Sequence, residues 1–243
     1  MKRSAKKTSS GGKIFGILFA LLAVIVIVVG FLFFNPFGGK ASNTAKKTNG
    51  SSTSASSQTI KYEPSQEEKD YLKNRFDQLI AVNPEAIAYV YAPGTELDEP
   101  VVQTTDNETY LNKTFDGGNV PYLGTVFMDM DNKKDFSDRL TWLFGHARGS
   151  KVGDHRMFND VNFYDKQDYF DQHPYVVIET PERKYYYEAM CLVIVPETTA
   201  FYRTSFKDDK DFTTQLKKVY EDGQTKNPNI KIKASDKYLV LST

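Results

Sequence analysis

The sequence contains little cysteine and no overall excess of charge. Cys191 is its single cysteine, which excludes an internal disulfide framework and any metal site built from several cysteines. Basic and acidic residues number 31 each. Five of the basic residues precede residue 14, where no acidic residue occurs: Lys2, Arg3, Lys6, Lys7 and Lys13. The rest of the chain is therefore net acidic and lacks the concentrated basic face of a nucleic-acid-binding protein, so we expect no nucleic acid among its partners.

A long apolar run follows this basic tail (residues 1–13). Residues 14–34 hold only apolar residues and glycines, enough for a helix of roughly 30 Å, the thickness of the hydrocarbon core of a bilayer. Such a run is too long for the core of a cleavable signal peptide. The pattern predicts an uncleaved transmembrane anchor with the lipid bilayer as a partner. By the positive-inside rule the N-terminus would be cytoplasmic and the folded domain extracellular.

The next segment differs sharply in composition. Residues 35–60 are rich in Ser, Thr, Gly, Asn and Lys and have few large apolar side chains. They cannot bury enough surface to offset the entropy lost on ordering. We interpret them as a flexible tether, and residues 61–243 as the folded domain.

The folded domain opens with a helix signal. Ser65 and Glu68 have the spacing of a capping box, and the Asn83-Pro84 dipeptide ends the helix because proline disfavours helical backbone in the residue before it. The apolar residues between them fall on one helical face: Leu72, Phe76, Leu79 and Ile80. A second helix is predicted over residues 208–222, with Gly223 suited to its C-terminal cap.

Short β-rich runs separated by turn residues fill most of the remaining domain. They are residues 87–91, 101–102, 125–128, 140–144, 175–179, 185–195 and 238–241. Many short strands at close spacing indicate a mostly antiparallel β-barrel with peripheral helices. The expected fold class is therefore mostly β, preceded by one transmembrane helix.

Five motifs in a fixed order resemble those of class B sortases, the cysteine transpeptidases of Gram-positive cell surfaces. The motifs are Asn83-Pro84-Glu85 with Tyr89, Pro100-Val101-Val102-Gln103 with Asp106-Asn107 and Tyr110-Leu111, Gly124 to Asp129, Gly145-His146 with Met157-Phe158, and Leu241-Ser242-Thr243. Each is weak alone, but the ordered series is specific. The resemblance implies the sortase β-barrel with the extra helices of class B.

The resemblance also implies site residues. His146 follows a predicted strand and matches the family's proton-transfer histidine. Leu241, Ser242 and Thr243 match the strand end that precedes the nucleophile and are assigned to substrate binding. The family's catalytic cysteine would follow Thr243 and its oxyanion-stabilising arginine would lie on the next strand. Neither is among these residues, so we expect this chain to be inactive by itself.

Other candidates have simpler interpretations. Cys191 lies among apolar residues with no basic neighbour, so we expect a small buried hydrophobe rather than a nucleophile. Arg148 and Arg203 do not match the family's arginine, and His155 and His173 are interpreted as solvated loop residues. A calcium loop starting at Asp129 fails because the required glycine and glutamate are absent. We expect no metal and no cofactor.

The leading hypothesis is a class B sortase-like transpeptidase that cleaves a C-terminal sorting motif on surface proteins or pilins. The acyl group would pass to an amine, either of a peptidoglycan cross-bridge or of a pilin lysine. Two alternatives stay open. One is a truncated, inactive sortase remnant without its nucleophile, and the other is a membrane-tethered peptide-binding module.

Overall fold

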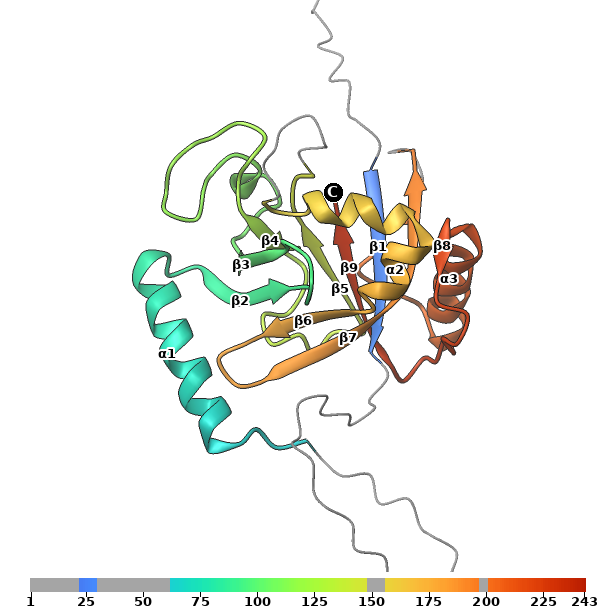
Figure 1. Cartoon of the computed structure of the whole chain (residues 1–243), viewed down its shortest axis with the longest axis horizontal. Helices are drawn as coiled ribbons and strands as arrows, with labels where there is room; N and C mark the ends of the chain where they lie inside the picture. Colours follow the sequence, from blue (N-terminus) through green and yellow to red (C-terminus); the bar gives the residue numbers. More distant parts are fainter. Residues whose placement is uncertain (1–21, 30–61, 148–155, 197–200) are drawn as a thin grey trace, which may run out of the picture.

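The computed structural model describes residues 22–29, 62–147, 156–196 and 201–243 (Figure 1). A single curled sheet dominates these residues, and helices pack around it. Its strands are β1 (Leu22–Val29), β2 (Ala86–Tyr91), β3 (Asp98–Val102), β4 (Val126–Met128), β5 (Leu140–Phe144), β6 (Tyr175–Glu179), β7 (Lys184–Val195), β8 (Thr225–Lys226) and β9 (Lys237–Ser242). The predicted strands of the folded domain are all present, which confirms the mostly-β class.

The strands follow the order β1-β9-β5-β4-β3-β2-β6-β7-β8. Strand β1 also pairs with β7, so the sheet curls until its two ends meet. Most neighbours are antiparallel, as predicted, but β3 pairs with β4 and β5 pairs with β9 in parallel. The parallel β5–β9 pair matters for function because the carboxyl ends of both strands reach the same edge of the sheet.

The predicted transmembrane anchor over residues 14–34 is wrong for the part that can be described. Residues 22–29 form strand β1, antiparallel to both β7 and β9, rather than a helix. Among the described residues no helix has the length and apolar character needed to span a bilayer. The cell-membrane localisation inferred from that anchor falls with it. Residues 1–21 and the predicted tether, residues 35–60, lie outside the described residues.

Helix α1 (Gln66–Val82) forms where the capping box predicts it. The Ser65 hydroxyl accepts a hydrogen bond from the backbone N–H of Glu68, 3.1 Å away, and Asn83 caps the other end. The helix lies against one end of the sheet (Figure 1). An ion-pair cluster fastens it there, because Arg75 reaches the buried carboxylate of Glu179 on β6.

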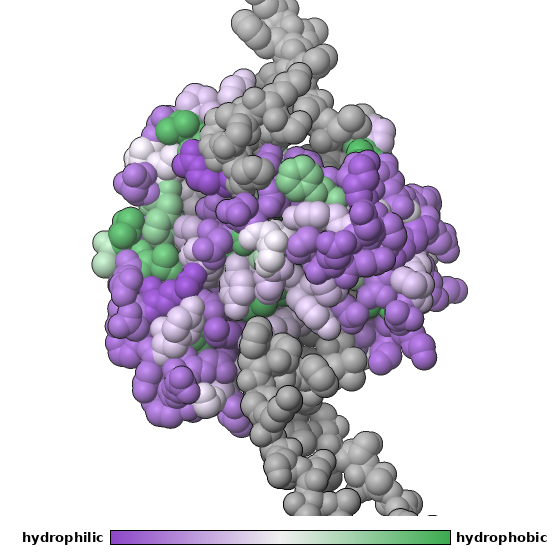
Figure 2. Space-filling view, viewed as in Figure 1, coloured by the Kyte–Doolittle hydropathy of each residue, from purple (hydrophilic) through white to green (hydrophobic). Residues whose placement is uncertain are grey.

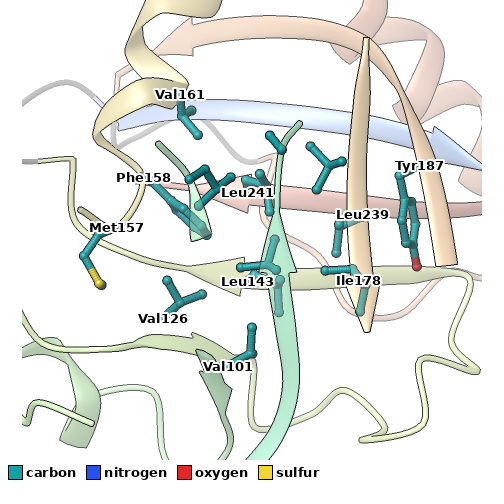
Figure 3. Close-up of a cluster of buried hydrophobic side chains, with 14 of the residues drawn as sticks. Val101, Val126, Leu143, Met157, Phe158, Val161, Ile178, Tyr187, Leu239 and Leu241 are labelled. Atoms are coloured by element: carbon teal, nitrogen blue, oxygen red, sulfur yellow. The ribbon is translucent and has the colours of Figure 1, made fainter. Parts of the chain in front are cut away.

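Two apolar clusters lie on opposite faces of β5 and β9. Leu143, Leu239 and Leu241 point into the curl of the sheet, where they meet side chains from β3, β4, β6 and β7 (Figure 3). Trp142 and Val240 point to the outer face, which helix α3 (Asp209–Asp222) covers. Both faces of these strands are thus buried, which fixes their register because a one-residue slip would exchange the two sets.

The remaining helices are short. Helix α2 (Gln167–Gln172) and the 3-10 segments η1 (Thr109–Leu111) and η2 (Asn159–Asp165) join the strands. The face shown in Figure 2 is largely hydrophilic, and its apolar side chains form only small patches. Such scattered apolar surface is ordinary for a folded domain.

Candidate active site at the ends of strands β5 and β9

His146 follows the end of β5 by two residues. The carboxyl ends of β5 and β9 lie side by side (Figure 1). Phe144 is paired with Ser242, and the backbone N–H of Gly145 donates to the carbonyl oxygen of Ser242 at 3.0 Å. A side chain at Gly145 would place its Cβ 3.0 Å from the ring of Phe158, so a glycine suits this approach. The fold therefore brings His146 and the Leu241-Ser242-Thr243 segment to the same edge of the sheet.

The imidazole of His146 is held by contacts with Leu111 and Tyr122, which precede β5 in the sequence. Its Nε2 lies 2.8 Å from the carbonyl oxygen of Leu111, and the ring of Tyr122 lies edge-on with the centroids 6.5 Å apart. A carbonyl oxygen only accepts hydrogen bonds, so Nε2 carries the proton in this contact. Nδ1 then keeps its lone pair in the neutral ring. A partly exposed imidazole oriented in this way can exchange a proton with a bound reactant.

The segment that holds His146 is itself fastened to the core. Tyr110, buried in η1, donates its hydroxyl to the carboxylate of Glu85 and accepts from the amide of Asn83 at 2.9 Å. The hydrogen bond from Tyr110 lowers the pKa of Glu85, and Lys113 lowers it further. Gly124 has a φ of +65°, and a Cβ there would lie 2.2 Å from the carbonyl oxygen of Tyr110. The carbonyl of Leu111 is consequently a well-positioned acceptor.

The three residues at the end of β9 differ in accessibility. Leu241 is fully buried in the inner core, and its side chain points away from the surface (Figure 3). Ser242 is 2% exposed, and its hydroxyl has no hydrogen-bond partner within the described part of the chain. Thr243 is partly exposed. Direct contact with a bound substrate is therefore easiest for Thr243 and, after a small opening, for Ser242.

An aromatic surface borders the site and was not singled out from the sequence. Trp142 stacks on Phe144 with an interplanar angle of 16°, and Tyr202 packs against both rings at centroid distances of 5.2 and 6.1 Å. Alternation along β5 predicts the shared face of Trp142 and Phe144. The approach of Tyr202, from a segment some sixty residues further on, has no signal in the local pattern.

Several other candidates take no part in the site. Cys191 on β7 is fully buried, as expected of a small hydrophobe, and burial raises the pKa of its thiol to about 12. Arg203 is bound by Asp211, with Nη2 and Oδ2 2.6 Å apart. His173 lies partly exposed in the loop after α2, where its ring packs on Tyr169 with the centroids 4.1 Å apart and its Nδ1 contacts the Tyr169 carbonyl. Arg148 and His155 lie outside the described residues.

The Asp129 turn is also structural. Its Oδ1 accepts from the backbone N–H of Asp131 at 2.8 Å, and its carbonyl oxygen accepts from the N–H of Asn132 at 3.0 Å. These bonds confirm the turn-forming role expected from the sequence. Within the described segments, no group of three or more potential ligands from His, Cys, Asp and Glu is arranged to hold a metal ion.

Comparison with known proteins gives a consistent result. No model of a known protein family matches the chain. Sortase B of Staphylococcus aureus is 26% identical over 175 residues, covering 72% of this chain and 69% of that protein. Sortase B of Listeria monocytogenes is 28% identical over 174 residues, covering 71% and 68%. The structure of the Staphylococcus aureus sortase B–substrate complex matches with a TM-score of 0.64 and 25% identity, covering 70% of this chain and 76% of that one.

The fold and the sequence relatives support a sortase-type transpeptidase. Both sequence relatives and the structural match are to sortase B. Among the sortases, the chain is similar to those of class B.

Proposed function

We propose that His146 is the proton-transfer group of an acyl-transfer reaction carried out at the ends of β5 and β9. The single observation that carries this role is the contact between His146 Nε2 and the Leu111 carbonyl, which orients the ring and leaves the lone pair of the neutral ring on Nδ1. In such a reaction the doubly protonated ring gives its Nδ1 proton to the leaving amine, and the neutral ring then accepts a proton on Nδ1 from the attacking amine.

The substrate we propose is the C-terminal sorting motif of a surface protein or a pilin. Thr243 and Ser242 would contact the bound peptide, since they lie at the same sheet edge as His146. Support comes from the similar fold of Staphylococcus aureus sortase B, whose matching structure is a complex with substrate. The acceptor would be an amine, either of a peptidoglycan cross-bridge or of a pilin lysine.

The nucleophilic thiol is not among these 243 residues. Cys191 is the only cysteine, and it is buried on β7. We propose that these residues supply substrate binding and proton transfer but form no thioester by themselves. They would then bind a sorting peptide without cleaving it, which is also the behaviour of a peptide-binding module.

The test uses two proteins: the 243-residue chain and the same chain extended by one cysteine after Thr243. Each is incubated with a library of internally quenched peptides that share a fixed threonine, and thioesters are trapped and detected by mass spectrometry. We expect cleavage and a thioester only with the extended chain, and loss of both when His146 is changed to alanine in it. An extended, folded chain that cleaves no peptide would contradict the proposal. Cleavage by the unextended chain would contradict the assignment of Cys191.

A further inference from the structure

Asp129, in the turn after β4, has a fully buried carboxylate that joins three separate segments. Its Oδ2 accepts from the Tyr202 hydroxyl at 2.5 Å and from the Asn107 side-chain amide at 2.9 Å. Its Oδ1 accepts from the backbone of Asp131 within the turn. Burying a carboxylate without enough hydrogen-bond donors costs free energy. Losing any one of these bonds would therefore destabilise the fold.

Tyr202 belongs to residues 201–206, which cross the outer face of β5. Other bonds also hold this segment. The Trp142 indole Nε1–H donates to the Arg203 carbonyl at 2.9 Å, the Gln215 amide donates to the Phe201 carbonyl at 2.6 Å, and Arg203 pairs with Asp211 with Nη2 and Oδ2 2.6 Å apart. Among these bonds, only that of Tyr202 reaches a fully buried carboxylate. Charge-assisted hydrogen bonds are roughly twice as strong as neutral ones.

The same carboxylate connects this segment to the histidine. Asn107, which shares Oδ2 with Tyr202, stands four residues before Leu111, whose carbonyl holds His146. The other side-chain atom of Asn107, its oxygen, accepts from the backbone N–H of Met130 at 2.9 Å. Residues 106–111 and 201–206 are therefore both bound to the carboxylate of Asp129.

We propose that the Tyr202–Asp129 hydrogen bond is a latch that fixes residues 201–206 beside Phe144 and so sets the affinity of the site for its peptide. Tyr202 acts as a positioning residue: its ring packs on Phe144, which pairs with Ser242, while its hydroxyl holds the segment in place. This inference rests on the proposed function, because it concerns the same peptide-binding edge.

The chain offers a built-in reporter for the latch. Trp142 is its only tryptophan, and its indole contacts both Arg203 and Tyr202. The test variant is Tyr202→Phe, which keeps the ring and removes the hydroxyl. The matched control is Tyr89→Phe on β2. It removes a hydroxyl that donates a hydrogen bond to the Asp98 carbonyl at 3.1 Å. Acrylamide quenching of Trp142 and thermal unfolding are measured for both variants and the unchanged chain.

We expect Tyr202→Phe to raise the quenching of Trp142 and shift its emission to the red, while Tyr89→Phe does neither. The best-bound peptide of the threonine library is then titrated, and its dissociation constant should rise about tenfold for Tyr202→Phe, the factor that corresponds to losing one charge-assisted hydrogen bond. In the cysteine-extended chain, KM should rise by the same factor with kcat changed less than about twofold, because the latch touches no reacting atom.

Other results would overturn the latch. Unchanged quenching in Tyr202→Phe would show that the hydroxyl does not hold the segment. Increased quenching with unchanged peptide affinity would show that the hydrogen bond holds residues 201–206 in place but has no role in peptide binding. If the unchanged chain binds no peptide, the proposed function fails and the affinity role fails with it, while the quenching result still decides whether the hydroxyl anchors residues 201–206.

Discussion

The Nε2 atom of His146 donates a hydrogen bond to the backbone carbonyl of Leu111, 2.8 Å away. The contact joins a catalytic candidate on the β5 side to a 3-10 turn that precedes it by more than thirty residues. It orients the ring without using a second side chain, in the way that carbonyl or carboxylate partners commonly fix the tautomer of functional histidines.

This contact predicts the tautomer of His146. In the neutral ring, the proton should reside on Nε2, because the Leu111 carbonyl can only accept. Two-dimensional nitrogen–proton NMR of ¹⁵N-histidine-labelled protein checks this, with the signal assigned by its loss in His146→Gln. A dominant Nδ1–H tautomer would contradict the geometry and the proposed route for the proton.

Cys191 should be chemically inert in the folded protein. Burial raises the pKa of its thiol to about 12, so the thiolate that reacts with alkylating agents is scarce at neutral pH. We expect iodoacetamide to label it at least about a hundredfold more slowly than in the urea-unfolded chain. Equal rates, measured by mass spectrometry of the native and unfolded samples, would show that β7 is open around this residue.

Glu179 should contribute strongly to stability. Its side chain is 1% exposed, and its two carboxylate oxygens lie 3.1 Å from Arg75 Nε and 2.8 Å from Lys184 Nζ. Removing the charge with Glu179→Gln leaves two cations that are only partly hydrated, and we expect the free energy of unfolding to fall by about 2 kcal/mol.

Urea titration measures this change. The control is Asp77→Asn, which breaks an exposed pair with Lys73 on the same helix and should cost less than about 0.5 kcal/mol. Equal effects of the two variants would show that the Glu179 cluster does not fasten α1 to the sheet.

Acid should weaken the anchoring of Arg203. Hydrogen bonding from Arg203 lowers the pKa of Asp211 to about 2, below the ordinary value of about 4. A lowered pKa in the folded state stabilises the fold above the unfolded-state value, and this contribution disappears as the pH falls from about 4 to about 2. The difference in melting temperature between the unchanged chain and Asp211→Asn should therefore shrink over that interval. A difference that stays constant from pH 5 to pH 2 would contradict the assignment.

Residues 22–29 lie far from the rest of the domain in the sequence, but their pairing as strand β1 predicts that they stabilise the sheet. Val26 is paired with Cys191 on β7 and with Val240 on β9. Proline at this position removes a backbone donor from the middle of the sheet, so Val26→Pro should lower the free energy of unfolding by about 1–3 kcal/mol. An unfolding midpoint unchanged by the substitution would show that residues 22–29 add nothing to the stability of the sheet.

Local signals predicted much of the fold. Ser65, Glu68 and Pro84 bound helix α1 through contacts within a few residues, and the β-rich runs reappear as strands β2 to β7 and β9. Helix α2 was missed because its six residues carry no side-chain cap. The strand at residues 22–29 was missed because an apolar run suits a helix and a buried strand equally. Only its pairing with distant β7 and β9 distinguishes the two.

The site, like the fold, could be predicted only where its residues carry a local sequence signal. His146 carries a motif and follows a strand, so its place could be read from its neighbours. The contact between Asp129 and Tyr202 spans 73 residues and depends on how two loops cross the outer face of the sheet. Neither residue has a local pattern that distinguishes it from an ordinary turn aspartate or surface tyrosine.

The parallel pairing of β5 with β9 has a consequence for how the protein folds. The two strands are separated by about a hundred residues, including all of β6, β7 and α3. Pairings of such long range form slowly, because the chain loses the entropy of closing a large loop before the contacts compensate for it. Since the carboxyl ends of β5 and β9 come together only when β9 docks beside β5, earlier folding intermediates lack the arrangement of the candidate site. In the cysteine-extended chain, a variant that slows the docking of β9 should therefore delay activity without changing the activity finally reached.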